Sequence, residues 1–297
     1  MTEKQLEKQR EQWIYKHNDL IQNVRFDLSA MEQKIVLFLC SKIGKDTEKL
    51  DWVNFKVDDF CEIIGIKGST MKSGSAMRSY VKNTVKAMAD KSFWIKRDGD
   101  KDVLCRWIHK MIIEWDSKVM AVKLDEDLSP YLIQLQSNYF QYQLYWVLEA
   151  DSKYTIPLYE LFKSEMWRKM QMLFEITELK EKLSVDKMKS YTGRVGNANF
   201  INKCIEPAVR EINELTDIKV TYKKVKETGC RAFTHLQFVV RDKNSKELDC
   251  AKRANEGKRH GQIHLETPET PQEITNAEAF PIAKLERNRK ELEHEND

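Results

Sequence analysis

The sequence predicts an α+β fold that consists of two similar domains in tandem and a disordered C-terminal tail. Three observations support this prediction: one stretch occurs twice, the same order of helix and strand patterns surrounds each copy, and a polar, aromatic-poor segment ends the chain. A chain of 297 residues, 41% of them apolar, can fill the cores of two ordinary domains. We expect an N-terminal extension at 1–17, domains at 18–137 and 138–242, and the tail at 243–297.

The internal repeat aligns "FKVDDFCEIIGI" (55–66) with "FEITELKEKLSV" (174–185). Apolar residues coincide along the alignment, which pairs Phe55 with Phe174, Val57 with Ile176, Phe60 with Leu179, Ile64 with Leu183 and Ile66 with Val185. Asp58 lies over Thr177, and both residue types favour the N-cap of a helix. Each copy is therefore predicted to be a short strand, a cap and a helix of about two turns.

The same further elements are predicted around each copy. A helix precedes the first copy, because Ser29 and Glu32 have capping-box spacing, and another precedes the second copy within 143–165. A long amphipathic helix follows each copy, at 73–92 and 197–214, and leads into a β-hairpin. The apolar faces of these two helices are Met77, Tyr80, Val81, Val85 and Met88, and Ile201, Cys204, Ile205, Ala208, Ile212 and Leu215; the hairpin turns fall near Asp98-Gly99 and Thr228-Gly229.

This order of helix, strand, short helix, long helix and hairpin is that of a winged helix, a helix-turn-helix variant whose second helix enters the major groove of DNA. The charge distribution supports the same interpretation. The net charge is only +3, but residues 67–110 contain 11 basic and 4 acidic side chains, and residues 186–231 contain 10 and 6. Both basic segments coincide with a long helix and its hairpin, so we expect two winged-helix domains that bind double-stranded DNA.

The candidate DNA-binding residues come from these two segments. They are Lys72, Ser75, Arg78, Lys82, Lys86, Arg97, Lys101, Arg194, Asn197, Asn199, Asn202, Lys203, Arg210, Lys223, Lys224 and Arg231. Asn199, Asn202 and Lys203 are expected nearest the bases, and the hairpin cations Arg97, Lys101, Lys223, Lys224 and Arg231 nearest the phosphates. A stripe such as Arg78, Lys82 and Lys86 alone is more often an ordinary solvated helix face, and only its recurrence in a second unit favours DNA binding.

Pro207 interrupts the second long helix, at a cost of about 3 kcal/mol in an ordinary helix interior. Two interpretations are open: a kink tolerated at a buried corner, or a bend that tilts the N-terminal half of the helix into a groove. His109 and His235 fall among apolar strand residues, which predicts packed core side chains rather than ligands.

The motifs of catalysis are absent from the sequence. It contains no His-x-His, no G-x-x-x-x-G-K-[ST] phosphate loop, no G-x-S-x-G and no HExxH. The cysteines at 40, 61, 105, 204, 230 and 250 lack CxxC spacing, which favours buried, reduced thiols. The longest apolar run, at 35–40, is far too short for a membrane span. We therefore expect a cytoplasmic binding protein with no enzymatic activity, cofactor, metal or membrane partner.

Several stretches together resemble the initiator replication (Rep) proteins of iteron-type plasmids. The most specific is "NFINKCIEPAVREINELTDIKVTY" at 199–222, and the other similar stretches lie at 18–43, 55–65, 77–95 and 153–162. The resemblance covers about residues 18–240 and does not extend to the tail.

The resemblance implies a protein that binds repeated DNA sequences, the iterons, at a plasmid origin through two winged-helix domains. It further implies opening of the adjacent duplex and recruitment of the replicative helicase together with the host initiator. In such proteins the C-terminal domain reads most of the sequence, which would fall here on the N-terminal half of the 197–214 helix. Members also dimerise through the N-terminal domain and repress their own gene, so monomers and homodimers, copy control and autoregulation are expected.

Three other functions compete with this expectation. A transcriptional regulator with the same tandem fold would bind DNA in the same way but would lack initiator activity. A protein-interaction module would use the same surfaces for a protein partner, and its DNA affinity would not respond to Arg78→Glu or Lys203→Glu. A metal-dependent nicking enzyme would relax supercoiled origin DNA in Mg²⁺ or Mn²⁺.

Overall fold

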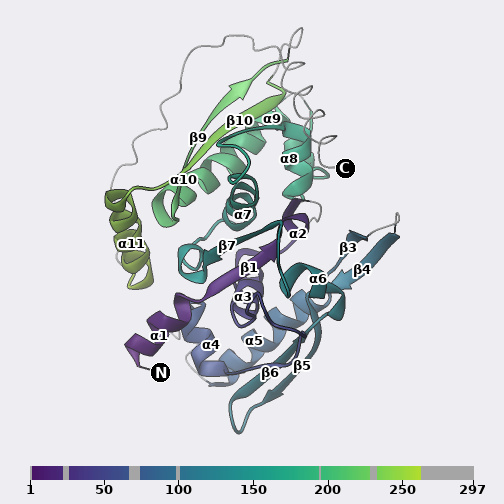
Figure 1. The fold of residues 1–297 in the computed structure, drawn as a ribbon, viewed down its shortest axis with the longest axis vertical. Coiled ribbons are helices and arrows are strands. Elements are labelled where there is room, and N and C mark those ends of the chain that lie inside the picture. The colour runs from purple at the N-terminus through teal and green to yellow at the C-terminus, as the bar shows by residue number, and fades with distance from the viewer. Residues whose placement is uncertain are drawn as a thin grey trace.

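The computed structural model describes residues 2–22, 27–66, 74–97, 101–193, 195–227 and 233–261. Two α+β units lie one above the other in Figure 1, the N-terminal unit in purple and blue and the C-terminal unit in teal and green. None of the helices in these ranges has the length and hydropathy of a membrane span.

The N-terminal unit contains one main sheet and one separate hairpin. Its elements are α1 (Glu3–Arg10), β1 (Trp13–His17), α2 (Asn18–Gln22), α3 (Ala30–Cys40), β2 (Val53–Lys56), α4 (Val57–Ile63), α5 (Gly74–Ala89), β3 (Ser92–Arg97), β4 (Lys101–Arg106), β5 (Ile108–Glu114) and β6 (Val119–Leu124). The sheet has the antiparallel order β2-β6-β5, and β3 pairs only with β4. The capping box predicted at Ser29 and Glu32 starts α3. On α5, Val81, Val85 and Met88 are buried as expected, whereas Tyr80 is exposed.

The C-terminal unit has a single antiparallel sheet in the order β8-β10-β9. The chain reaches it through η1 (Glu126–Leu128), α6 (Ser129–Leu132), β7 (Tyr139–Gln143) and η2 (Leu144–Val147). The unit consists of α7 (Thr155–Glu165), β8 (Gln171–Glu175), α8 (Ile176–Lys182), η3 (Lys189–Tyr191), α9 (Gly196–Phe200), η4 (Ile201–Ile205), α10 (Glu206–Leu215), β9 (Ile218–Val225), β10 (His235–Asp242) and α11 (Ser245–Arg259).

The two units repeat each other down to single hydrogen bonds, which confirms the internal repeat. The short helices α4 and α8 begin at equivalent residues, where the N–H of Val57 donates to Lys118 O and the N–H of Ile176 donates to Thr234 O, both at 2.8 Å. Asp58 and Thr177 thus lie inside the first turn, and the expectation that they are N-caps is wrong. Both helices end in the same way, with Gly65 and its counterpart Ser184 at positive φ.

The N-terminal unit departs from the repeat in its strands. The hairpin predicted around Asp98-Gly99 forms as β3 and β4, but a second hairpin, β5 and β6, supplies the strands of the sheet. A bulge between Ile108 and Lys110 changes the alternation of side chains at the start of β5. His109 is exposed for this reason, so the expectation of a packed core histidine is wrong there, whereas His235 is buried as expected.

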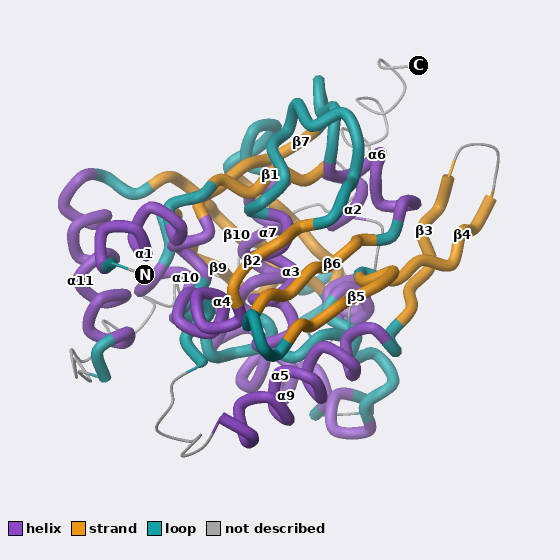
Figure 2. Tube along the Cα trace, turned by 90° about the horizontal axis from the view of Figure 1, so that it is seen from below, coloured by secondary structure: helices purple, strands orange, loops and turns teal. Residues whose placement is uncertain are grey.

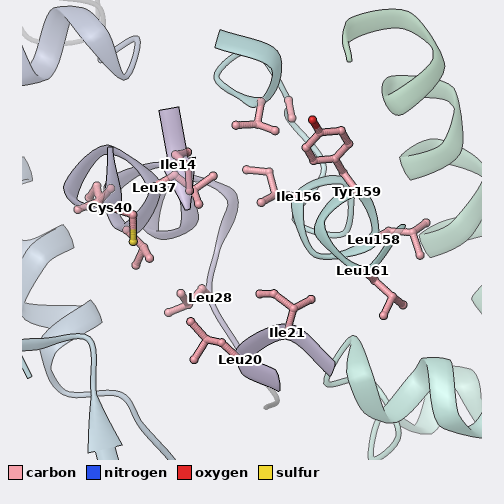
Figure 3. Close-up of a cluster of buried hydrophobic side chains, with 14 of the residues drawn as sticks. Ile14, Leu20, Ile21, Leu28, Leu37, Cys40, Ile156, Leu158, Tyr159 and Leu161 are labelled. Carbon is pink, nitrogen blue, oxygen red and sulfur yellow. The ribbon is translucent and has the colours of Figure 1, made fainter. Parts of the chain in front are cut away.

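One continuous core joins the two units. Figure 3 shows Ile14 of β1, Leu20 and Ile21 of α2 and Leu37 of α3 gathered around the apolar side chains of α7. Within this core the ammonium of Lys16 lies 2.7 Å from the carboxylate of Glu160, which also accepts a hydrogen bond from Tyr142. β1 pairs with β7, so residues 13–17 and 139–143, which the expected boundaries separate, form one small sheet.

A helix follows the last strand of the C-terminal unit. α11 begins with a capping box of Asn244 and Glu247 and packs beside α10, where the amide of Asn255 donates to Leu215 O at 2.6 Å (Figure 1). The expectation of a disordered tail from residue 243 is therefore wrong for residues 245–259. Residues 262–297 lie outside the described part of the chain.

Candidate nucleic-acid interface

The long helix of the C-terminal unit consists of three segments rather than one. α9 leads into a π-helical turn, η4, and α10 continues from Glu206. Pro207 lies in the first turn of α10, where a missing backbone N–H costs little. The π-helical turn therefore absorbs the interruption that the proline causes, and such turns occur frequently at functional sites.

The inner face of this composite helix is the one that the sequence predicts. Its apolar residues are at most 2% exposed: Ile201, Cys204, Ile205, Ala208, Ile212 and Leu215. Cys204 packs against the hydroxyls of Tyr154 and Tyr191, and burial raises the pKa of its thiol. Together with α7 beneath it, this face fixes which residues of the helix point outward.

The outer face carries Asn202, Lys203 and Arg210, all exposed. Glu206 lies between the two cations and accepts a 3.2 Å hydrogen bond from the hydroxyl of Tyr222 on β9. The carboxylate of Glu206 would repel a phosphate, but its hydrogen bond to Tyr222 directs it toward β9. The exposed amide and cations have the donors needed for base edges and phosphates.

Other polar residues of the stretch that resembles Rep proteins hold the helix in place. The amide of Asn213 donates to Val220 O at 2.8 Å and accepts from Val220 N at 2.7 Å, which joins α10 to β9. Asp217 accepts hydrogen bonds from Tyr159 and Lys163 of α7. These contacts set the angle of the helix against the sheet.

The beginning of the composite helix is packed very closely. A Cβ atom added to Gly196 would lie 2.5 Å from the backbone C and O atoms of Tyr191, so only glycine fits. Asn197, a predicted DNA-binding residue, accepts from Lys180 Nζ at 2.6 Å and donates to Phe233 O at 3.1 Å. Asn199 donates to Ser190 O at 3.1 Å. The structure thus places the amides of two predicted DNA-binding residues in contacts within the protein, and one of them, Asn199, was expected near the bases.

The hairpin of β9 and β10 forms the wing of this unit. Lys223 and Lys224 are half-buried along β9, whereas Lys226 beyond the strand is exposed. The ammonium of Lys226 lies 5.1 Å from the ring centre of Phe233, which is itself exposed. Arg194 and Arg231 lie outside the described residues.

The N-terminal unit presents its cations on one continuous helix. Lys82 and Lys86 are exposed on α5, and Lys101 is exposed where β4 begins. α5 and α9 both lie toward the lower edge of Figure 2, so α5 and the beginning of the composite helix lie on the same side of the molecule. Lys72 lies outside the described residues, as do the side chains of Ser75, Arg78 and Arg97.

Within the described ranges, no group of three or more His, Cys, Asp or Glu side chains could hold a metal ion. Four of the expected buried thiols are confirmed, at Cys40, Cys61, Cys105 and Cys204, whereas Cys250 is exposed. Burial raises the pKa of Cys40 to about 11 and that of Cys61 to about 12, so these thiols are weak nucleophiles.

Sequence reasoning missed several residues that shape this surface. Lys180 lies in the charged run "ELKEK" and gives no sign that it is buried. Phe233 and Lys226 belong to a hairpin for which the sequence analysis derived candidate DNA-binding residues only from the pattern of charges. Gly196 could have been found, because a glycine directly before a predicted helix often marks a close backbone approach.

Two winged-helix units, each with exposed cations on its long helix, define the class: a DNA-binding protein of the tandem winged-helix type. Family models agree with this class. Residues 13–163 match the model described as "Initiator Replication protein, WH1", and residues 175–240 match "Initiator Rep protein, WH2". The chain belongs to the initiator replication (Rep) protein family.

The fold is similar to that of a protein of known structure. The chain is similar to the Pi initiator protein, crystallised in complex with iteron DNA, with a TM-score of 0.60, 17% identity, and coverage of 79% of this chain and 99% of that one. Domains 2 and 3 of RctB match with a TM-score of 0.41 at 14% identity, covering 74% of this chain and 85% of that one. The WH1 domain of the replication protein MSBI1.176, isolated from a multiple sclerosis patient, matches with a TM-score of 0.26 at 14% identity, covering 35% and 79%. No curated protein matches the chain.

Proposed function

We propose that this protein initiates plasmid replication by binding repeated double-stranded DNA at an origin. The observation that carries the proposal is that both winged-helix units expose cations on their long helices, Lys82 and Lys86 on α5 and Lys203 and Arg210 on the composite helix. α5 and the beginning of the composite helix lie on one side of the molecule, an arrangement that suits two neighbouring grooves of one duplex. The Pi initiator, which has a similar fold, was crystallised with iteron DNA.

In this proposal the cations bind phosphates and the exposed amide reads bases. Lysine and arginine release condensed counterions when they bind DNA, so the affinity falls as the salt concentration rises. With about 6 phosphate contacts, the logarithm of the binding constant should fall against the logarithm of the salt concentration with a slope, here called the salt slope, near −5. Asn202 and Lys203, on the composite helix, are the described side chains best placed for base edges.

The further steps follow from family membership. The bound protein promotes opening of the adjacent duplex and recruits the replicative helicase with the host initiator, in the cytoplasm where plasmid DNA resides. A dimer formed through the N-terminal unit represses the protein's own gene, which couples plasmid copy number to the supply of initiator.

A footprint tests the proposal. The purified protein is bound to the DNA that flanks its own gene at about 150 mM salt, with a random duplex of equal length as the control. Protection of several direct repeats at helical-turn spacing supports an initiator. Protection of a single inverted repeat over the promoter supports a transcriptional regulator instead, and equal affinity for random DNA contradicts the proposal.

A further inference from the structure

A buried lysine lies directly beneath the start of the composite helix. Lys180 of α8 is 8% exposed, and its ammonium donates to Tyr191 O at 2.7 Å and to Asn197 Oδ1 at 2.6 Å. It also lies 5.8 Å from the ring centre of Phe200. Burial lowers the pKa of this ammonium, which shows that its position is costly in the charged form.

The winged-helix fold itself does not require this lysine. The internal repeat places Cys61 of α4 at the equivalent position, where the same helix-ending hydrogen bonds run from Ile66 N to Cys61 O and from Val185 N to Lys180 O, both at 2.8 Å. Cys61 is buried and apolar in character, and the N-terminal unit forms the same turn around it. The lysine therefore serves a task that is specific to the C-terminal unit.

Asn197 extends the contact from the lysine to the wing. Its oxygen accepts from Lys180 and its nitrogen donates to Phe233 O. The ladder between β9 and β10 ends at Val225 and His235, so Phe233 lies beyond the last paired residues. The amide of Asn197 thus connects the composite helix to the part of the wing that carries Phe233 and Lys226.

We infer that Lys180, Asn197 and the carbonyl of Phe233 form a tether that holds the wing against the composite helix, so that both contact the DNA as one unit. Asn197 is then a positioning residue and not a base-reading one. The inference rests on the proposed function for the DNA that is bound, but the tether is a property of the winged-helix unit and acts on any duplex.

A double-mutant cycle with Lys226 tests the tether. We expect Lys226→Ala to weaken DNA binding about threefold and to reduce the salt slope by about one, since it removes one phosphate contact. We expect Asn197→Ala to weaken binding about tenfold. Because the untethered wing no longer presents Lys226, adding Lys226→Ala to Asn197→Ala should have almost no further effect. If the losses of DNA affinity in the two single variants multiply in the double variant, Asn197 does not act through the wing and the inference is overturned.

Asn197→Asp separates positioning from folding. The aspartate keeps an oxygen for Lys180, so the buried lysine stays paired, but its second oxygen cannot donate to Phe233 O and repels it. The wing is then released, and Lys226→Ala should again add nothing. If Lys226→Ala keeps its full effect in Asn197→Asp, the asparagine serves only to pair the buried lysine and the inference fails. The cycle is measured on the protected DNA and on a random duplex. If the protein shows no preference for the protected DNA, the proposed function is contradicted. The coupling between the Asn197 and Lys226 substitutions, measured on random DNA, would still show whether the tether exists.

Discussion

The carboxylate of Glu211 on α10 accepts a 2.5 Å hydrogen bond from the hydroxyl of Thr155 at the start of α7. The same carboxylate accepts from the backbone N–H groups of Asp151 and Ser152, and Lys258 of α11 lies 3.7 Å away. A buried acid on the composite helix therefore holds the segment through which the chain enters the C-terminal unit.

We expect Glu211→Ala to lower the free energy of unfolding by roughly 3 kcal/mol, because it leaves buried N–H groups without an acceptor. Urea denaturation measures this loss. Glu214→Ala is the matched control, since Glu214 is exposed on the same helix and its removal should change stability by less than about 0.5 kcal/mol. Equal losses in the two variants would contradict the role given to Glu211.

Gly196→Ala should weaken DNA binding by displacing the beginning of the composite helix. The new methyl group meets the backbone of Tyr191 at 2.5 Å, so the first turn of α9 must shift. Gly44→Ala is the control, because its Cβ would meet only Thr47 Oγ1, at 3.6 Å, which is ordinary contact. Binding by fluorescence anisotropy should fall about tenfold or more for Gly196→Ala and stay unchanged for Gly44→Ala. Unchanged affinity in both would show that the position of α9 does not matter for DNA.

Lys203→Glu should reduce DNA affinity at least about tenfold and reduce the salt slope, since it replaces an exposed cation on the outer face with an anion. Lys246→Glu makes the same charge change at an exposed residue in the first turn of α11, outside the composite helix. Affinity measured at several salt concentrations separates the two. A loss of equal size in both variants would mean that only net charge, and not this surface, governs binding.

Lys243 should make stability depend on pH in the alkaline range. Burial, with a smaller effect of Lys219, lowers its pKa from the ordinary 10.5 to about 8. Between pH 8 and 10.5 the unfolded chain holds a proton that the folded protein has lost, so stability relative to Lys243→Met should rise with pH, by on the order of 3 kcal/mol at most. Urea denaturation of both proteins at pH 7, 8, 9 and 10 measures this difference, and a constant difference would contradict the shift.

The order of elements and the repeat could be predicted because apolar periodicity determines them. Phe55 and Phe174 in β2 and β8, and Ile64 and Leu183 at the ends of α4 and α8, occupy equivalent places because each pair packs against the core in the same way. The bulge that exposes His109 could not be predicted, because one extra residue in a strand leaves no mark in the pattern. α11 was missed for another reason: its buried residues are Ala251, Asn255 and Gly257, so it lacks an apolar stripe. The capping-box spacing of Asn244 and Glu247 was the available signal.

The candidate site was predictable only in part. Lys203, Arg210, Lys82 and Lys86 are exposed, as helical periodicity implies. Asn197 lies on the composite helix with Lys203 and Arg210, yet the oxygen and the nitrogen of its amide both have partners inside the protein. These partners lie 17 and 36 residues away in the sequence, so no local pattern reveals them.

The π-helical turn also determines how this surface can change. A π-helical turn contains one residue more than an α-helical turn but covers nearly the same rotation, so α9 and α10 keep the directions that they would have in a regular helix one residue shorter. The deletion of a single residue within 201–205 would therefore restore a regular helix while Asn199 and Arg210 kept their present directions. A single deletion within α10 would instead rotate the residues on one side of it by about 100° relative to those on the other. This turn can thus change length by one residue without redirecting the surface on either side of it.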